Sequence, residues 1–442
     1  MIQPPVKFLD VTGVDEVATS RSFRGLVGVL AAEAASLSAN RLLAIAVPWF
    51  VLTTTGSVAS TGLVAFCQIT PFVVVQALAG PLIDRAGPRR VSIAGDVVST
   101  VAMAAVPLLY AADALPLWAL MALMAVTGAA DGPSNAAKSV FVPSATRAAG
   151  QPLERGTGLN TAVERAGTVI GPAIAGVVVA AYGGAQALWI AAALFGLAAL
   201  ITALTLTDPV REAPSADGYV ARLREGGRFL RQEPLLRAIV GMVIITNLLD
   251  QAFIAVLLPV WARTTGHGAQ ADGLAVSVFG ATSIVAAVVA AAVGNRLPRL
   301  PVYLIGFVVG GIPRFVAMAL YLPLWSLLAV FAVAGLGSGF INPIIGAVMY
   351  ERIPASLLGR VRTLTSALSW SGIPFGGLFG AALVGLTGLT GALWITGALY
   401  LLAIVLPALR PEWSQMRRSA IVLPAPADAG VTFERAARLE SD

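Results

Sequence analysis

The residues most able to do chemistry are charged and amide side chains that interrupt long apolar runs. The run over residues 25–53 contains Glu33, Asn40 and Arg41. Glu33 and Asn40 are seven residues apart, which is two turns along one face of a helix. An ionised side chain among apolar residues is costly unless it is paired or hydrated, so such residues mark paths for ions and substrates. Glu33 is therefore a candidate proton-binding residue, and a hydrated acid near the end of the helix is the alternative.

A second set of polar residues interrupts the apolar run over residues 237–260. Asn247, Asp250 and Gln251 lie close together near the middle of this run. A carboxyl group held among apolar helices can take up and release a proton near neutral pH. Asp250 is therefore a second candidate for binding a proton or a cation, and the two amides are candidates for contacting a substrate.

Asp131 is a third acid within an apolar run. Asn135 and Lys138 follow it one and two turns further along the same helix. Lys138 or Arg41 could neutralise Asp131, or the carboxylate could contact a substrate, and the sequence leaves these alternatives open. Arg314 lies in a further apolar run, and the sequence identifies no partner for it.

The composition explains why apolar runs are so common. Of 442 residues, 57% are apolar and 12% are charged, whereas a soluble chain carries roughly a quarter charged residues. A helix needs about 20 apolar residues to cross a membrane, and it satisfies its own backbone hydrogen bonds there. The runs predict an all-α membrane protein with 12 transmembrane helices, near residues 25–53, 59–82, 91–111, 117–141, 158–181, 187–207, 237–260, 273–294, 301–321, 326–349, 363–386 and 392–409.

The basic residues predict how these helices are oriented. Lys and Arg gather in loops on the cytoplasmic side of a membrane. With the N-terminus inside, Arg263 is the one basic residue of 29 in an outer loop, and Arg41 and Arg314 lie deep within helices. The other 26 lie in cytoplasmic segments or in the innermost turns of the helices. We therefore expect both termini to be cytoplasmic. The pI near 9.9 then reflects orientation and not binding to nucleic acid.

The two sets of six runs repeat one another. A shift of 211 residues places Pro48 on Pro259 and Asn40 on Gln251, and each half carries three tryptophans at matched ends of its runs. Such internal repeats are typical of membrane transporters. The sequence predicts two pseudo-symmetric six-helix bundles over residues 25–207 and 237–409, a cytoplasmic N-terminal tail over 1–24, a cytoplasmic linker over 208–236 and a cytoplasmic tail over 410–442.

The turn after the second run carries a glycine-rich charged motif. Residues 80–90 read GPLIDRAGPRR and resemble the G-x-L-x-D-R-x-G-R-R signature of the major facilitator superfamily, with Pro88 where arginine is commoner. In that family the loop latches the two halves, because its acid faces a helix N-terminus, where an anion is stabilised. A charged turn that only fixes topology is the alternative. The resemblance assigns the latch to Gly80, Asp84, Arg85, Gly87, Arg89 and Arg90.

Further motifs resemble one branch of this superfamily. Gly167, Gly171, Pro172 and Gly176 are similar to the antiporter motif of drug:proton exporters. Small residues at this spacing also permit close packing of helices, which is the alternative role. The segments AVPWFVL at 46–52 and EGGRFL at 225–230 resemble macrolide-efflux and actinobacterial Tap-type multidrug exporters.

The resemblance covers residues 25 to about 410 and implies a monomeric exporter of lipophilic or cationic small molecules, driven by protons, in the lipid bilayer of a bacterial inner membrane. The branch commonly has Asp where Asn40 stands. Asn cannot titrate, so proton movement must use another carboxylate, and Glu33 and Asp250 are the candidates. An exporter of one endogenous product, such as a siderophore or antibiotic, and a non-transporting membrane sensor are the alternatives.

The sequence also lacks the motifs that would indicate ATP binding, catalysis or a metal site. It has no G-x-x-x-x-G-K-[ST] loop for ATP, no nucleophile motif and no spacing of ligands for a metal site. Its single cysteine, Cys67, allows no disulfide framework, and its single histidine, His267, lies in a polar loop. We therefore expect no cofactor, no metal, no nucleic-acid partner and no enzyme activity.

Overall fold

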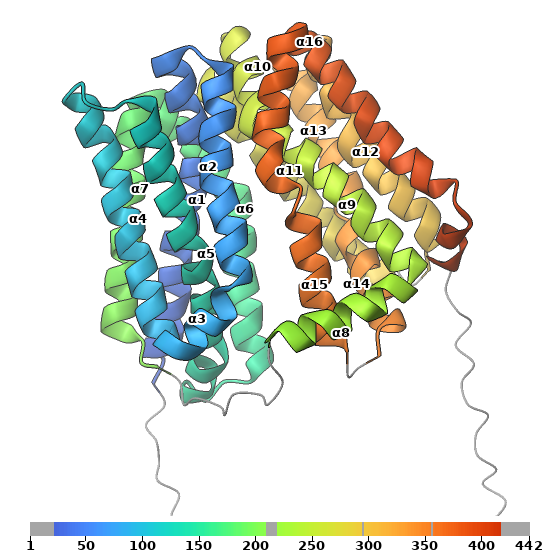
Figure 1. The fold of residues 1–442 in the computed structure, drawn as a ribbon, viewed down its shortest axis with the longest axis horizontal. Helices are drawn as coiled ribbons and strands as arrows, with labels where there is room; N and C mark the ends of the chain where they lie inside the picture. Colours follow the sequence, from blue (N-terminus) through green and yellow to red (C-terminus); the bar gives the residue numbers. More distant parts are fainter. Residues whose placement is uncertain (1–21, 209–218, 294–295, 355–356, 417–442) are drawn as a thin grey trace, which may run out of the picture.

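The computed structural model describes residues 22–208, 219–293, 296–354 and 357–416, which form helices and no strand (Figure 1). The first half of the chain contains α1 (Arg24–Thr55), α2 (Val58–Ala77), α3 (Ala79–Ala86), α4 (Pro88–Ala111), α5 (Leu117–Ala148), α6 (Leu153–Tyr182) and α7 (Gly184–Thr205). The second half contains α8 (Tyr219–Gln232), α9 (Pro234–Ala252), the π-helix η1 (Phe253–Leu257), α10 (Leu258–Thr264), α11 (Gly268–Val293), α12 (Arg299–Ala319), α13 (Leu324–Ser338), α14 (Ile341–Arg352), α15 (Leu358–Trp370), α16 (Ile373–Ala408) and the 3₁₀ helix η2 (Pro411–Met416).

Local residue choices set where the first helices begin and end. α1 ends at Gly56, whose φ of 67° is readily adopted by glycine, and the Gly56 N–H donates to the Leu52 carbonyl at 3.1 Å. Ser57 caps α2, because its Oγ accepts a hydrogen bond from the backbone N–H of Ser60 at 3.1 Å. Proline is favoured at the first position of a helix, and α4 begins at Pro88.

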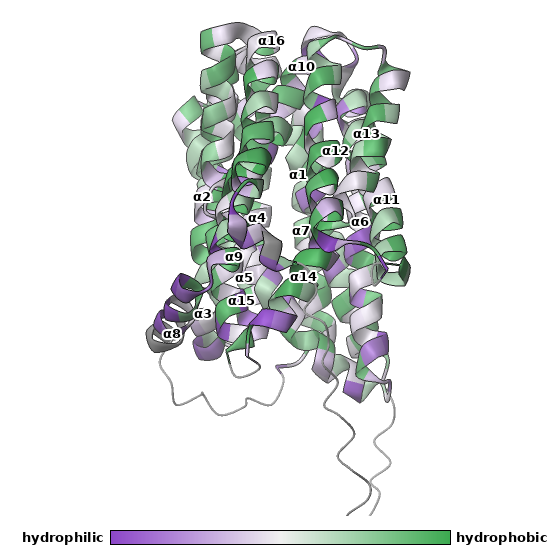
Figure 2. Cartoon of the chain, turned by 90° about the vertical axis from the view of Figure 1, so that its right-hand side faces the viewer, coloured by the Kyte–Doolittle hydropathy of each residue, from purple (hydrophilic) through white to green (hydrophobic). Residues whose placement is uncertain are grey.

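The long helices are suited to a membrane. Ten helical stretches within the described residues are long and apolar enough to cross a bilayer. Apolar residues cover their outer surfaces, and polar residues gather around α8 and the loops at the same end (Figure 2). The ten stretches do not include α5, and the last joins α15 and α16, in which Gly388 has non-helical angles. An all-α membrane fold is thus confirmed, whereas the count of 12 helices stays a prediction.

The two halves form two helix groups that meet toward one end of the molecule, which we call the α10 end (Figure 1). A Cβ added to Gly273 of α11 would lie 2.2 Å from the carbonyl oxygen of Pro172 in α6. A Cβ added to Gly62 of α2 would lie 2.4 Å from the carbonyl oxygen of Gly377 in α16. The backbones at both crossings are therefore close enough that only glycine fits.

Further contacts at the α10 end join the halves. Arg263 of α10 donates a hydrogen bond to the carbonyl of Leu52 in α1. One buried apolar cluster also combines both halves, and it consists of Leu52, Ala65, Ala255, Val256, Val260 and Ala381.

Helix α8 lies at the opposite end, which we call the α8 end (Figure 1). Glu225 of α8 forms an ion pair with Arg360 of α15, so α8 packs against the second half. The predicted linker over 208–236 thus contains a helix, and residues 209–218 of it lie outside the described residues, as do most of both predicted tails.

Tryptophans mark the α10 end, with one exception to the predicted pattern. Trp118, Trp325, Trp189 and Trp394 are exposed, as expected for rings at a membrane interface. Trp261 is instead fully buried beneath His267, with ring centroids 5.5 Å apart. Trp261 thus packs into the core of the second half, although its matched position in the repeat suggests the same exposure as the other tryptophans.

Candidate functional site

The second half contains a buried ion pair that the sequence does not reveal. Asp250 of α9 pairs with Arg314 of α12. The Arg314 side chain is 6% exposed and the Asp250 side chain 33% exposed. The second carboxylate oxygen of Asp250 accepts a hydrogen bond from the Tyr400 hydroxyl at 3.5 Å. Asp250 is therefore neutralised from inside the bundle and remains accessible from one side.

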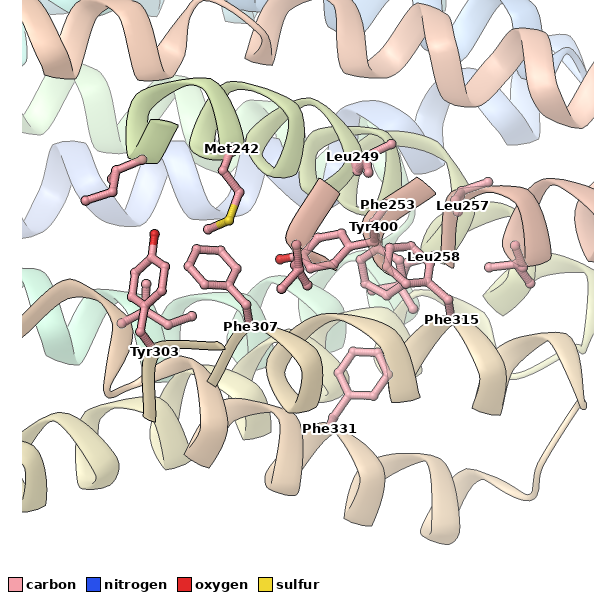
Figure 3. Packing of buried hydrophobic residues seen from close by; sticks show 14 of the residues in the cluster. Met242, Leu249, Phe253, Leu257, Leu258, Tyr303, Phe307, Phe315, Phe331 and Tyr400 are labelled. Atoms are coloured by element: carbon pink, nitrogen blue, oxygen red, sulfur yellow. The ribbon is translucent and has the colours of Figure 1, made fainter. Parts of the chain in front are cut away.

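Aromatic rings surround the Arg314 guanidinium. Its central carbon lies 4.7 Å from the ring centroid of Phe253, 5.2 Å from that of Phe315 and 5.7 Å from that of Tyr400, and Phe279 completes the set at 5.6 Å. Figure 3 shows Phe253, Phe315 and Tyr400 close together within the buried core. The rings attract a cation through their negative faces, so Arg314 is held among them even if Asp250 becomes neutral.

A π-helix lies directly beside this pair. η1 begins at Phe253, three residues after Asp250, and joins α9 to α10. Single π-turns inside α-helices are rare and frequently lie at functional sites. Here the acid that precedes the π-turn and the aromatic ring that begins it both reach Arg314.

The predicted amide residues on α9 lie at contacts between helices, and their role toward a substrate stays a prediction. Asn247 donates a hydrogen bond to the Ser369 carbonyl of α15 at 2.9 Å. A Cβ added to Gly376 would lie 2.6 Å from the Cβ of Gln251, so Gln251 lies at the crossing of α9 and α16. Both residues are near Asp250 in the chain, but neither forms a hydrogen bond or ion pair with it within the described residues.

The first half contains a separate polar network around Asp131. Asn40 of α1 donates a hydrogen bond to one oxygen of Asp131 at 3.0 Å, and Asn135 donates to the other at 3.1 Å. Asn135 also accepts a hydrogen bond from Ser36 at 3.4 Å. Asp131 is 5% exposed. An Asp at position 40 would put a second carboxylate against Asp131, where the two could share one proton, so Asn40 supplies the hydrogen bond permanently.

Lys138 neutralises a different acid from the one the sequence suggests. Its Nζ lies 2.8 Å from Asp96 of α4 and donates further hydrogen bonds to Ser36 at 3.1 Å and Ser134 at 2.9 Å. Asp131 is thus paired with neither Lys138 nor Arg41, so that suggested alternative was wrong. The hydrogen bonds run without a break from Asp96 through Lys138, Ser36 and Asn135 to Asp131, and they tie α1, α4 and α5 together.

Glu33 and Arg41 flank this network on α1. Glu33 is 8% exposed and forms no hydrogen bond or ion pair with the described residues. Arg41 donates a hydrogen bond to the Thr168 hydroxyl of α6 at 3.1 Å. A buried carboxylate without an ionised partner is costly, which favours its protonated form. Glu33 therefore remains a candidate proton-binding residue.

The antiporter-like motif packs α6 against both halves. Gly167 faces Leu37 and Gly171 faces Arg41, both on α1, whereas Pro172 and Gly176 contact Gly273 of α11. The motif therefore lies where α6 contacts both α1 of its own half and α11 of the second half, and its small residues permit both contacts.

We expect Gly171→Ala to lower the stability of the fold by about 1–3 kcal/mol, as overpacking does. The added Cβ would lie 2.7 Å from Cγ of Arg41 and 2.8 Å from its Cβ, atoms too near the backbone to move freely. Gly158→Ala on the same helix meets nothing within 4 Å and serves as the control. Thermal unfolding of both purified variants measures the difference, and equal unfolding temperatures would contradict the packing role of Gly171.

The latch motif forms the end of α3 and the start of α4. Gly87 adopts a φ of 88° between them. The Arg89 backbone N–H donates to Asp208 at 2.9 Å, and its side chain donates to the Ala203 carbonyl at 2.7 Å. Asp84 is exposed and forms no hydrogen bond or ion pair with the described residues. The described residues thus offer Asp84 no partner, and the roles of Gly80, Asp84, Arg85 and Arg90 stay predictions.

Sequence reasoning missed one buried acid, Asp272. It is 1% exposed, and neither carboxylate oxygen has a hydrogen-bond partner within the described residues. The apolar run was taken to begin at residue 273, but α11 begins five residues before that, at Gly268. The glycine turn at Gly266 and Gly268, both with positive φ, was the available signal for an earlier start.

The two halves therefore hold two unlike polar groups inside an apolar bundle. An acid–amide–lysine network lies in the first half, and an acid–arginine pair with aromatic neighbours lies in the second. No hydrogen bond joins the two groups within the described residues. Buried titratable groups within a membrane bundle that shows an internal repeat are typical of membrane transport proteins. The fold and the two groups therefore indicate that class.

Comparison with known proteins identifies the family. The model of the Major Facilitator Superfamily matches residues 29–250 and 240–420. This chain belongs to that superfamily. It is 33% identical over 379 residues to the multidrug efflux pump Tap of Mycobacterium tuberculosis, which covers 83% of this chain and 89% of that protein. It is 29% identical over 374 residues to the pump of the same name from Mycolicibacterium fortuitum, covering 82% and 90%.

Solved structures share the fold at low sequence identity. The nucleoside transporter NupG superposes with a TM-score of 0.70 at 16% identity, covering 89% of this chain and 98% of that one. A bacterial homologue of the human lysosomal transporter Spinster, in an inward-facing and unoccupied conformation, gives a TM-score of 0.67 at 14% identity, covering 91% and 100%. At these identities the comparison supports the fold and not the substrate.

Proposed function

We propose that this protein is a secondary active exporter of lipophilic or cationic small molecules, driven by proton entry. One observation carries the proposal: Asp250 is paired with a buried arginine on one side and is one-third exposed on the other. Such an acid can exchange its partner for a proton or a cation at the exposed side. The multidrug efflux pumps to which the chain is similar support export as the direction of transport.

The geometry supports a simple exchange at Asp250. When the carboxylate is ionised, Arg314 and Tyr400 hold it, and its exposed side can attract a cationic substrate. When it binds a proton, its attraction for both cations falls. Arg314 keeps its position through the surrounding rings, so the bundle remains packed while the substrate leaves. Proton and substrate therefore compete for one carboxylate, which is the condition for antiport.

The arrangement of the halves supports alternating access. The close crossings of α6 with α11 and of α2 with α16 lie at the α10 end, and α3, the helix that carries the exposed Asp84, lies toward the α8 end. Rocking of the two halves would separate the helices at these two crossings and bring α3 toward the second half. In the orientation expected from the basic residues, these close crossings lie on the outer side of the membrane.

Reconstitution of the purified protein in liposomes with an imposed pH gradient tests the function. Several lipophilic cations should then be transported in the direction opposite to the flow of protons. Transport of one endogenous compound alone would instead identify a dedicated exporter. Transport that ignores the gradient would identify facilitated diffusion, and no transport of any kind would leave a membrane sensor as the better interpretation.

We expect the α8 end to face the cytoplasm of a bacterial inner membrane, with both termini on that side. Residue 215 of the linker lies outside the described residues, so the test uses His267 at the α10 end and Glu154 at the start of α6, both exposed. After replacement of Cys67 with serine, cysteine at position 267 should react with an impermeant thiol reagent in intact cells, and cysteine at position 154 should not. Equal labelling at both positions would contradict this topology.

A further inference from the structure

An apolar groove runs along the outside of the second half, and neither Asp250 nor Arg314 lines it. It has a volume of about 1030 Å³ and lies between α9 and α16. The two segments of α16 on either side of Gly388 flank α9 (Figure 1), and each supplies a wall. The lining is mainly apolar and includes Ile245, Leu248, Phe379, Leu399, Leu402 and Leu406.

Charged side chains gather at one end of this groove. Arg237 lies in the first turn of α9, and Arg410 and Glu412 follow the end of α16. The Arg237 side chain donates a hydrogen bond to the Arg231 carbonyl at 3.0 Å. The side chains of Arg410 and Glu412 form no hydrogen bond or ion pair with the described residues, and one oxygen of Glu412 is buried.

This combination of shape and charge is unlike an ordinary lipid-facing surface. The three charged groups lie on one groove, yet none pairs with another within the described residues. Two guanidinium groups match one phosphate group. A carboxylate beside them would repel a purely anionic headgroup but would attract an ammonium group. The long apolar lining matches an acyl chain, which the surrounding membrane supplies.

We propose that this groove binds one membrane phospholipid whose headgroup carries an ammonium group. Its acyl chain lies between α9 and α16, its phosphate group contacts Arg237 and Arg410, and its ammonium group contacts Glu412. The site is separate from the acid proposed for proton exchange, since within the described residues none of these three charged residues forms a hydrogen bond or ion pair with Asp250.

Gly241 allows the groove to be filled without disturbing the helices. It lies on the groove wall, and a Cβ added there meets nothing within 4 Å. Gly241→Leu would therefore occupy the space of the acyl chain. Gly385 of α16 is the matched control, because it is exposed, also has nothing within 4 Å of an added Cβ, and does not line the groove.

The test measures phospholipid retained by the full-length protein after purification in mild detergent. Phosphatidylethanolamine and phosphatidylglycerol are supplied in equal amounts, and bound lipid is counted by native mass spectrometry. We expect the wild-type protein to retain one phosphatidylethanolamine per chain. Gly241→Leu and the double variant Arg237→Ala with Arg410→Ala should lose about tenfold in affinity or more. Glu412→Gln should remove the preference for phosphatidylethanolamine.

Gly385→Leu and Arg147→Ala, which changes an exposed arginine of α5 outside the groove, should leave lipid retention unchanged. Equal retention by all variants would overturn the proposal, because the lipid would then be bound non-specifically around the protein. A wild-type preference for phosphatidylglycerol would overturn it as well. So would lipid binding that occurs only after residues 417–442 are deleted, since the chain itself would then occupy the groove.

Discussion

Asp250→Asn is expected to abolish transport driven by a pH gradient while downhill exchange of substrate continues. The asparagine side chain keeps the shape of the acid and can still meet Arg314 and Tyr400, but it cannot bind and release a proton. Binding of substrate and rocking of the halves do not themselves require that proton. Uptake into inside-out vesicles, with and without a gradient that is acid inside, separates the two activities.

The same variant should also be less stable, which requires a control. Arg314 would lose its only ionised partner among the described residues. Breaking a buried ion pair costs about 3–5 kcal/mol, and since Asp250 is one-third exposed we expect a loss nearer 1–3 kcal/mol. The double variant Asp250→Asn with Arg314→Gln removes both charges and should recover stability without recovering proton-driven uptake.

Glu33→Gln provides the comparison on the other half of the repeat. We expect a smaller effect on gradient-driven uptake, because Glu33 has no basic partner among the described residues to exchange for a proton. Full gradient-driven uptake in both Asp250→Asn and Glu33→Gln would contradict the assignment of proton coupling to either acid. Asp131, held by two amides, would then be the next candidate.

The sequence predicts the helical membrane fold well because the signal for it is local. Each long apolar run is sufficient to define a helix in a membrane, and α1, α4, α6 and α7 each overlap a predicted run along nearly its whole length. Asp250 and Asp131 stand out for the same reason, since a charged residue within such a run is rare.

The partners of these residues depend on packing between helices and cannot be read from local patterns. Arg314 lies 64 residues from Asp250 in the chain, and only the crossing of α9 with α12 brings them together. Spacing along α5 suggests that Lys138 lies on the Asp131 side. In the structure α4 packs against α5 and offers Asp96 at 2.8 Å instead. The contact between α4 and α5, and not the spacing along α5, therefore decides which acid Lys138 pairs with.

Errors at helix ends explain why Asp272 was missed. The first turn of α11 contains polar and small residues, which lower its hydropathy below that of a typical span. The burial of Asp272 comes from the close crossing of α11 with α6 at Gly273 and Pro172. Both residues lie in predicted apolar runs, but nothing in those runs shows that the two helices cross there, so the burial of the neighbouring acid appears only in three dimensions.

The second large effect is expected from the buried pair of Asp96 and Lys138. The two side chains are 1% and 0% exposed. Lys138 uses all three of its protons, on Asp96, Ser36 and Ser134. Asp96→Asn or Lys138→Met alone leaves the other charge buried without an ionised partner, and each should lower the free energy of unfolding by about 3–5 kcal/mol.

The double variant Asp96→Asn with Lys138→Met should be much more stable than either single variant. Neutral side chains of similar volume avoid the cost of burying charge, and such replacements of whole ion pairs are often neutral or stabilising. Glu351→Gln serves as the control, because it disrupts an ion pair with Arg299 in which the acid is 52% exposed, and exposed pairs are worth about 0–1 kcal/mol. Thermal unfolding of the four purified variants gives the comparison.

Transport by the stable double variant then separates a structural role of the pair from a role in coupling. The hydrogen bonds from Lys138 through Ser36 and Asn135 reach Asp131, so the pair could either fix that acid or exchange protons with it. We expect the double variant to retain gradient-driven uptake, because in our proposal the exchanging carboxylate is Asp250. If the double variant is stable but loses gradient-driven uptake while downhill exchange continues, protons must pass through the first half, and the network around Asp131 is the coupling site.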